Sequence, residues 1–163
     1  MSSTKLDITV LNSNVAIGSK ECNVAAAATT IYPGEPVAKT LGGVTVTAAA
    51  DGTPVVATDY FEGIATDKST QTATVAGKVS VMPLLPGTIY LIEGKAPTGI
   101  DTQAEYDALV GKRLVLDLTA GKYTIDTAAG DGATNGCVVQ ALDIKAFPGK
   151  VAFSFRNGVS VLS

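Results

Sequence analysis

The chain has 163 residues, a formal net charge of −3 and no histidine, and only 17% of its residues are charged. A chain of this length is expected to form one domain and to bury a core without disulfides or metals, and its 46% hydrophobic content argues against a disordered chain. The basic residues form no cluster, which argues against direct binding of DNA or RNA because phosphate binding needs many clustered cations. The apolar runs are short, so no membrane span is expected, and the start of the chain resembles no secretory signal, so synthesis in the cytoplasm is expected.

Runs in which polar and apolar residues alternate recur along the chain, and this alternation is typical of strands with one buried face. They cover residues 5–11, 44–47, 78–82, 122–126 and 150–156. Residues 114–118 and 137–142 are more continuously apolar, which favours strands buried on both faces. The alanine-rich residues 25–28 are ambiguous, but the following Thr29, Thr30, Ile31 and Tyr32 favour a strand.

Glycine and proline pairs separate these runs at short, fairly regular spacing, as in sandwiches and barrels. Asn157-Gly158 predicts a tight hairpin near the C-terminus. We therefore predict an all-β protein with a small barrel or sandwich. Residues 1–22 form an N-terminal arm or a first strand, and residues 23–163 form a single β-rich domain.

One segment, near residues 102–110, predicts a short helix inserted between strands. Thr102 and Glu105 have the spacing of a capping box, in which each side chain bonds the other residue's backbone N–H. Tyr106, Leu109 and Val110 are expected on one apolar face of this helix.

The residue types that carry most enzyme chemistry are scarce. Without histidine there is no Ser-His-Asp or Cys-His pair and no histidine metal ligand. The neighbouring carboxylates Asp59 and Glu62, and likewise Glu105 and Asp107, are expected on solvated faces. We predict no enzymatic activity, no cofactor and no metal site.

Two further features leave alternatives open. The loop at residues 126–132 carries two aspartates among glycines, but a calcium loop of the EF-hand type needs more acidic positions, so a plain loop is favoured. The two cysteines, Cys22 and Cys137, are expected to be free buried or half-buried thiols, with a single disulfide as the alternative.

The order of several short strings resembles the head decoration (cement) proteins of tailed bacteriophages. The resemblance covers roughly residues 30–156, and the inserted segment at 101–110 and the long N-terminal segment depart from it. The matching strings share a turn followed by a strand, and they lie at residues 32–37, 61–67, 73–81, 86–91, 119–124, 137–142 and 151–156.

The resemblance implies a small, β-tulip-like and non-catalytic protein that sits on the capsid exterior of the virion. Such proteins typically form homotrimers and clamp neighbouring subunits of the major capsid protein, which stabilises the shell. An extended N-terminal arm often adds a strand to a capsid edge, because strand addition makes few sequence demands. The residues expected to contact the capsid here are Lys5, Leu6, Asp7, Ile8, Thr9, Val10 and Leu11; the alternative is an ordinary first strand of the core.

Two other functions remain open. A tail-tube or fibre subunit would assemble into tubes or fibres. A carbohydrate-binding β-sandwich is disfavoured because only 6% of residues are aromatic and none is tryptophan.

Overall fold

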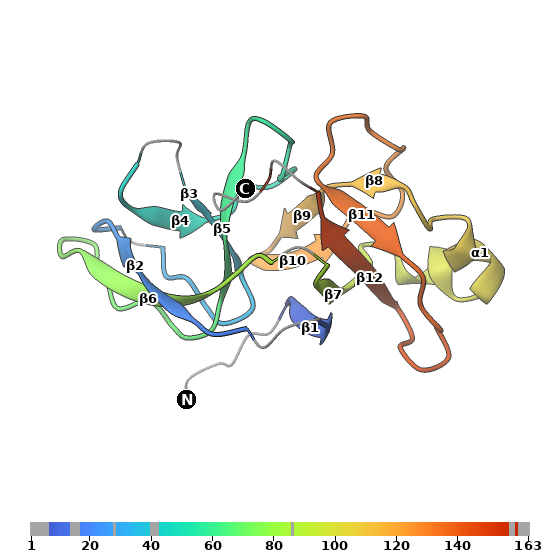
Figure 1. Ribbon diagram of the computed structural model, residues 1–163, viewed down its shortest axis with the longest axis horizontal. Coiled ribbons are helices and arrows are strands. Elements are labelled where there is room, and N and C mark those ends of the chain that lie inside the picture. Colours follow the sequence, from blue (N-terminus) through green and yellow to red (C-terminus); the bar gives the residue numbers. More distant parts are fainter. Residues whose placement is uncertain are drawn as a thin grey trace.

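The computed structural model describes residues 7–13, 17–27, 29–39, 43–85, 87–156 and 159. These residues form an all-β fold of two units that lie side by side (Figure 1). The first unit is a closed barrel with the strand order β2-β4-β3-β5-β6. Its strands are β2 (Lys20–Val24), β3 (Pro36–Lys39), β4 (Val46–Ala48), β5 (Tyr60–Ala65) and β6 (Gly77–Pro83).

The second unit is a five-stranded sheet with the order β1-β7-β12-β11-β8, accompanied by a two-stranded hairpin. The sheet contains β1 (Thr9–Asn12), β7 (Ile89–Glu93), β12 (Lys150–Phe155), β11 (Cys137–Gln140) and β8 (Arg113–Leu114). The hairpin is β9 (Leu116–Thr119) with β10 (Lys122–Ile125), and the helical turns are η1 (Pro97–Ile100) and α1 (Gln103–Asp107). The predicted fold class, an all-β small barrel with one short inserted helix, is confirmed.

Alternation separates buried from exposed side chains in some of the predicted strands. In β6, Val79 and Val81 are buried in the barrel, while Lys78 near the start of the strand is exposed. In β12 the predicted alternation is wrong, because Ala152 is buried together with its neighbours Val151 and Phe153 in a strand that lies between β7 and β11. The predicted strand at 114–118 is split into β8 and β9, because Leu116 bonds the Thr53 and Gly52 backbone instead of continuing the first pairing.

The helix has the predicted start but ends early. The Thr102 side chain accepts from the Glu105 backbone, and the Glu105 side chain accepts from Thr102, so the capping box is present. Tyr106 and Leu109 are buried, but Val110 is 42% exposed. The prediction for Val110 is wrong because α1 ends at Asp107 and the chain then turns, with Gly111 at a φ of +85°.

The strand favoured at residues 25–32 is also wrong where the structure describes it. Side chains rather than a strand partner satisfy this backbone: Ile31 N donates to Ser69 Oγ at 2.8 Å, and Tyr32 N donates to Glu35 Oε2 at 3.0 Å. Hydrogen bonds from the backbone to side chains compete with the backbone-to-backbone hydrogen bonds that a strand makes in a sheet. The predicted hairpin at Asn157-Gly158 lies outside the described residues.

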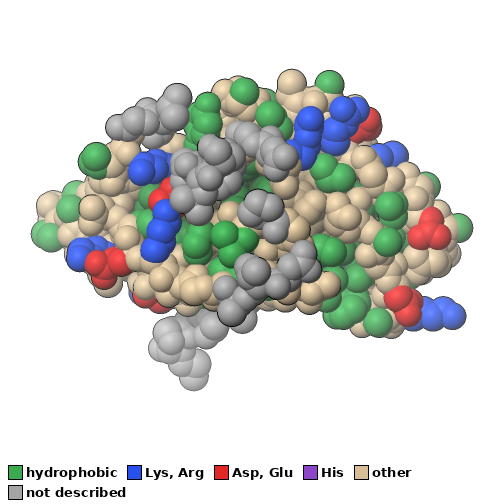
Figure 2. All heavy atoms as spheres, viewed as in Figure 1, with side chains coloured by type: hydrophobic (Ala, Val, Ile, Leu, Met, Phe, Trp, Pro, Cys, Tyr) green, Lys and Arg blue, Asp and Glu red, His purple; other side chains and the backbone are tan. Residues whose placement is uncertain are grey.

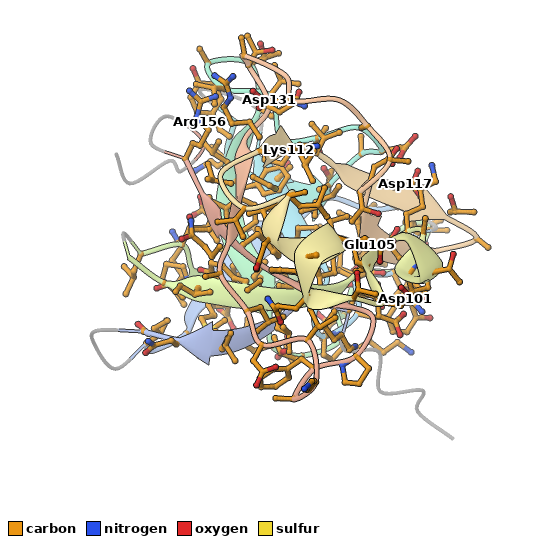
Figure 3. The ribbon with its side chains drawn as sticks, turned by 90° about the vertical axis from the view of Figure 1, so that its right-hand side faces the viewer. Asp101, Glu105, Lys112, Asp117, Asp131 and Arg156 are labelled. Carbon is orange, nitrogen blue, oxygen red and sulfur yellow. The ribbon has the colours of Figure 1, made fainter. Side chains whose placement is uncertain are left out.

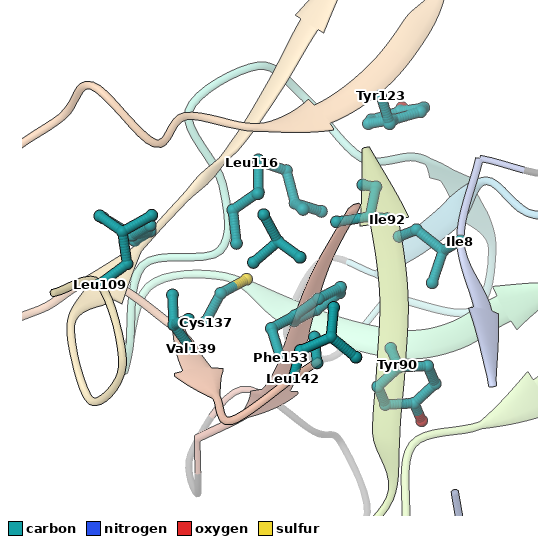
Figure 4. Packing of buried hydrophobic residues seen from close by; sticks show 14 of the residues in the cluster. Ile8, Tyr90, Ile92, Leu109, Leu116, Tyr123, Cys137, Val139, Leu142 and Phe153 are labelled. Atoms are coloured by element: carbon teal, nitrogen blue, oxygen red, sulfur yellow. The ribbon is translucent and has the colours of Figure 1, made fainter. Parts of the chain in front are cut away.

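Two hydrophobic clusters form the core, and β5 contributes to both. The larger cluster fills the sheet unit, where Ile92, Leu116 and Phe153 are among its members (Figure 4). It also includes Phe61 and Ile64 of β5. The smaller cluster fills the barrel and includes Ala65 of the same strand. A Cβ at Gly63 would lie 2.0 Å from the Met82 carbonyl oxygen, so β5 and β6 approach here as only glycine allows. β5 is thus a strand of the barrel whose side chains contribute to the cores of both units.

Tyr106 fastens α1 to the sheet. Its hydroxyl donates to Gln140 O at 2.8 Å and accepts from Ala152 N at 2.9 Å, at the point where β11 and β12 separate. A single side chain thus replaces a missing rung of the backbone ladder. No helix among the described residues has the length and apolar character that crossing a membrane requires.

Candidate interaction site at the N-terminal strand

The N-terminal strand β1 lies at an edge of the five-stranded sheet. It pairs antiparallel with β7, with Thr9 opposite Leu91 and Val10 opposite Tyr90. No described strand pairs with its other side. An edge strand of this kind presents backbone N–H and C=O groups to a further strand.

The residues just before β1 tie it to three parts of the fold. Ile8 is buried in the larger cluster, and its N–H donates to Gly34 O of the barrel at 3.1 Å. Asp7 Oδ2 accepts from Tyr123 N of β10 at 2.9 Å. This segment is therefore built into the junction of barrel, sheet and hairpin, where it also meets β7.

The predicted contact residues consequently divide into groups. Thr9–Asn12 is a first strand of the sheet, which was the alternative to a free arm. Lys5 and Leu6 lie outside the described residues. The boundary placed after residue 22 falls inside β2, because Lys20–Val24 is a strand of the barrel.

Most side chains of β1 remain accessible. Thr9, Val10 and Asn12 are exposed, and Val10 has an exposed fraction of 37%, whereas Leu11 packs partly against the larger cluster. On the face of the molecule shown in Figure 2, hydrophobic side chains are visible over the sheet half with few charged ones between them. A partner at this edge would meet the outer backbone groups of β1 and the exposed side chains of Thr9, Val10 and Asn12.

The barrel holds an internal polar group that alternation did not predict. Glu62 is only 5% exposed, which contradicts the solvated face expected for it. Its Oε1 forms an ion pair with Lys20, and Cys22 Sγ donates to the same oxygen at 3.9 Å. Its Oε2 is buried without a hydrogen-bond partner. The irregular register of β3 against β5 places this carboxylate toward β2.

This cluster does not supply a nucleophile. Burial raises the pKa of the Cys22 thiol, and the negative charge of Glu62 raises it further. The thiol therefore stays protonated at neutral pH, and thiolate is the reactive form of cysteine. Burial likewise raises the pKa of Cys137. Both cysteines are free and buried, which confirms the prediction of two free thiols.

The remaining carboxylates singled out in the sequence are engaged locally. Asp59 Oδ2 accepts from Val55 N at 2.7 Å, so Asp59 does not face Glu62 across a cleft. In the glycine-rich loop, Asp126 Oδ1 accepts from Ala128 N at 3.1 Å. Asp131 binds Arg113 through both carboxylate oxygens, and this contact holds the pKa of Asp131 well below its usual range.

These contacts describe a plain loop at residues 126–132, as favoured above. Among the described residues there is no group of three or more His, Cys, Asp or Glu side chains that could hold a metal ion.

The sequence patterns did not predict the ion pairs that Lys95 forms between the sheet and the hairpin. Lys95, just after β7, lies 2.6 Å from Asp117 Oδ1 and 3.6 Å from Asp126 Oδ2. The hydrogen bond from Lys95 lowers the pKa of Asp117. The only signal in the sequence is that Asp117 interrupts an otherwise apolar run.

Comparison of the chain with protein-family models, curated proteins and solved structures finds no match.

Proposed function

We propose that this chain is a capsid decoration protein, which binds the outside of an icosahedral phage head and clamps neighbouring subunits of the major capsid protein. Its place would be the virion exterior, and it would act as a homotrimer without direct contact to nucleic acid. The observation that carries the proposal is the order of strand-and-turn strings that resembles this family. An all-β fold with an open sheet edge is compatible with that role.

The contact we propose is strand addition at β1. The outer edge of Thr9–Asn12 has backbone groups that a capsid segment can bond, and the exposed Val10 side chain lies beside them. Each such contact is small, but many copies bound to a repeating lattice hold the shell with large avidity.

The test is binding of the purified protein to expanded, DNA-free shells of the phage that encodes it. Bound protein is measured by cosedimentation, and the shells are imaged by electron microscopy. We expect protein at regular positions on the shell and a higher temperature of shell disruption. Absence of binding at every protein concentration would overturn the proposal, and tubes formed by the protein alone would favour a tail-tube subunit.

A matched pair of variants locates the contact. Val10→Lys places a charge beside the β1 edge, and we expect it to weaken shell binding about tenfold or more because a buried charge opposes strand addition. Val75→Lys makes the same change at a site that is 61% exposed on the barrel, and it should leave binding unchanged. Equal binding by the two variants would show that β1 is not the contact.

A further inference from the structure

The barrel is closed by one short contact between β2 and β4, which we call the seam. The two strands run parallel, and among the described residues they share a single pair of facing residues, Val24 and Val46. By contrast, β2 shares five such pairs with β6, and β4 shares three with β3. The seam is therefore the shortest contact between neighbouring strands in the described part of the barrel.

The chain leaves the seam on both sides of this pair. After Val24 the backbone turns toward the loop between β5 and β6, where Ala27 N donates to Thr72 O at 3.0 Å. Before Val46 lies Val44, whose side chain is 80% exposed. Because side chains alternate along a strand, a β4 that began earlier would place Val44 inside the barrel beside Val46. Neither described flank thus extends the contact.

A second single pair in the molecule shows what the seam lacks. Gly94 faces Ile125 of β10 in an isolated bridge, and Lys95 reinforces it. Lys95 N donates to Ile125 O at 2.8 Å, and its side chain lies 2.6 Å from Asp117 Oδ1. Asp117 is labelled in Figure 3, which looks onto the α1 end of the molecule. At the seam, no side-chain hydrogen bond or ion pair between described residues joins the two strands, because the charged side chains of β2 bond β5 and β6.

The interior behind the seam contains a group that water would stabilise. Glu62 Oε2 is buried without a hydrogen-bond partner. A buried polar oxygen without a partner carries a desolvation penalty, which is relieved when water reaches it. The side chains around it in the barrel are small aliphatic ones, so less apolar surface meets water here than in the aromatic core of the sheet unit. Both terms lower the free energy of opening the barrel.

We propose that the barrel opens at the seam while the rest of the fold stays intact. Opening separates Val24 from Val46 and leaves the other four pairs of neighbouring barrel strands in place, so it costs less free energy than global unfolding. The open state admits water to the interior, where the side chain of Cys22 lies. The opening belongs to the fold and does not depend on the proposed function.

The two free cysteines report on the two units separately. Cys22 is buried in the barrel and Cys137 in the core of the sheet unit, and each reacts as the thiolate once it is exposed. The full chain is treated with iodoacetamide under native conditions, and mass spectrometry of its peptides follows the labelling of each cysteine. Each rate is divided by the rate of the same cysteine in the urea-unfolded protein, which removes the difference in intrinsic reactivity.

We expect the corrected rate of Cys22 to be about tenfold or more above that of Cys137, because only global unfolding exposes Cys137. Urea below the unfolding transition should accelerate Cys137 strongly and Cys22 weakly, since a local opening exposes little surface. Equal corrected rates, with the same dependence on urea, would show that the barrel opens only when the whole chain unfolds, and the proposal would then be wrong.

A matched pair of truncations assigns the opening to the seam. Val46→Ala removes two methyl groups from the seam and should raise the Cys22 rate about fivefold or more. Val81→Ala makes the same change at a buried position of the same cluster, but Val81 stays between β2 and β5 in the open state, so the rate should change much less.

The Cys137 rate in the same samples shows whether each variant is folded. A Cys22 rate that ignores Val46→Ala, or that responds equally to both truncations, would show that the reagent reaches this thiol by another route than the seam. Either result contradicts the proposal, and the comparison of Cys22 with Cys137 in the natural protein stands even if one variant does not fold.

Discussion

The barrel and the sheet unit solve the same packing problem with different side chains. The barrel interior is filled by small aliphatic residues such as Val37, Val79 and Val81. The sheet unit buries large aromatic residues, among them Tyr90 and Phe153, whose ring centroids lie 5.7 Å apart. A five-stranded barrel leaves a narrow interior that short side chains fill, whereas the space between the sheet, the hairpin and the barrel wall accepts whole rings.

The difference predicts where the chain is most sensitive to truncation. Phe153→Ala removes a fully buried ring from the sheet unit and should lower the free energy of unfolding by about 3–5 kcal/mol. Val81→Ala removes two methyl groups from the barrel and should cost about 1–2 kcal/mol. Urea unfolding followed by circular dichroism gives both values.

The same experiment tests whether the units unfold together. Because β5 contributes Phe61 to one cluster and Ala65 to the other, we expect a single transition in the natural protein and in both variants. Two separate transitions would show that the shared strand does not couple the units.

The buried carboxylates of the two units are the second contrast. Asp117 of the sheet unit bonds Lys95 through one oxygen and Thr119 through the other, whereas Glu62 of the barrel bonds Lys20 through Oε1 and keeps Oε2 buried without a hydrogen-bond partner. Lys20→Met leaves the Glu62 carboxylate buried without its cation. Because the Lys20 side chain is 37% exposed, we expect a loss of about 1–3 kcal/mol, less than for a fully buried pair.

Two further variants control this measurement. The double variant Lys20→Met with Glu62→Gln removes both charges and should recover most of the lost stability. Lys78→Met breaks the exposed pair with Glu21 and should cost about 0–1 kcal/mol. A double variant that is less stable than Lys20→Met alone would show that Glu62 is not a buried charge that depends on Lys20.

A smaller effect is expected where α1 meets the sheet. Tyr106→Phe removes the hydroxyl that bonds Gln140 O and Ala152 N and leaves both backbone groups without that partner. We expect a loss of about 1–2 kcal/mol in thermal or urea unfolding. Faster amide exchange at Ala152, with little change at Val79 in the barrel, would show that the effect stays in the sheet unit.

The sequence predicted those parts of the fold that depend on local patterns. Alternation located β6, β10 and β12, and the spacing of Thr102 and Glu105 located the start of α1. These patterns act within a few residues, so they can be read without knowing what lies opposite.

The parts that failed depend on contacts between distant residues. Glu62 was placed in solvent because a carboxylate usually is, but an irregular register turns it toward Lys20, 42 positions earlier in the chain. Ile31 was placed in a strand because its residue type favours one, but Ser69 takes its N–H. The barrel order, with β2 beside β4 and β6, likewise follows from closure rather than from any single strand.

The smallest effect concerns the contribution of the Arg113–Asp131 ion pair to stability in acid. Arg113 lowers the pKa of Asp131 in the folded state, so this pair contributes stability above the pKa of an unfolded aspartate, near 4, and loses it as the pH falls further. Asp131→Asn removes that contribution, so the variant should differ from the natural protein at pH 6, and the difference should shrink steadily as the pH falls from about 4 toward the lowered pKa of Asp131. Urea unfolding midpoints measured across this range give the difference directly. Because the pair is exposed, the difference should shrink in about 1 M salt, and a constant difference at every pH would show that Asp131 acts through its backbone contact to Arg113 N rather than through its charge.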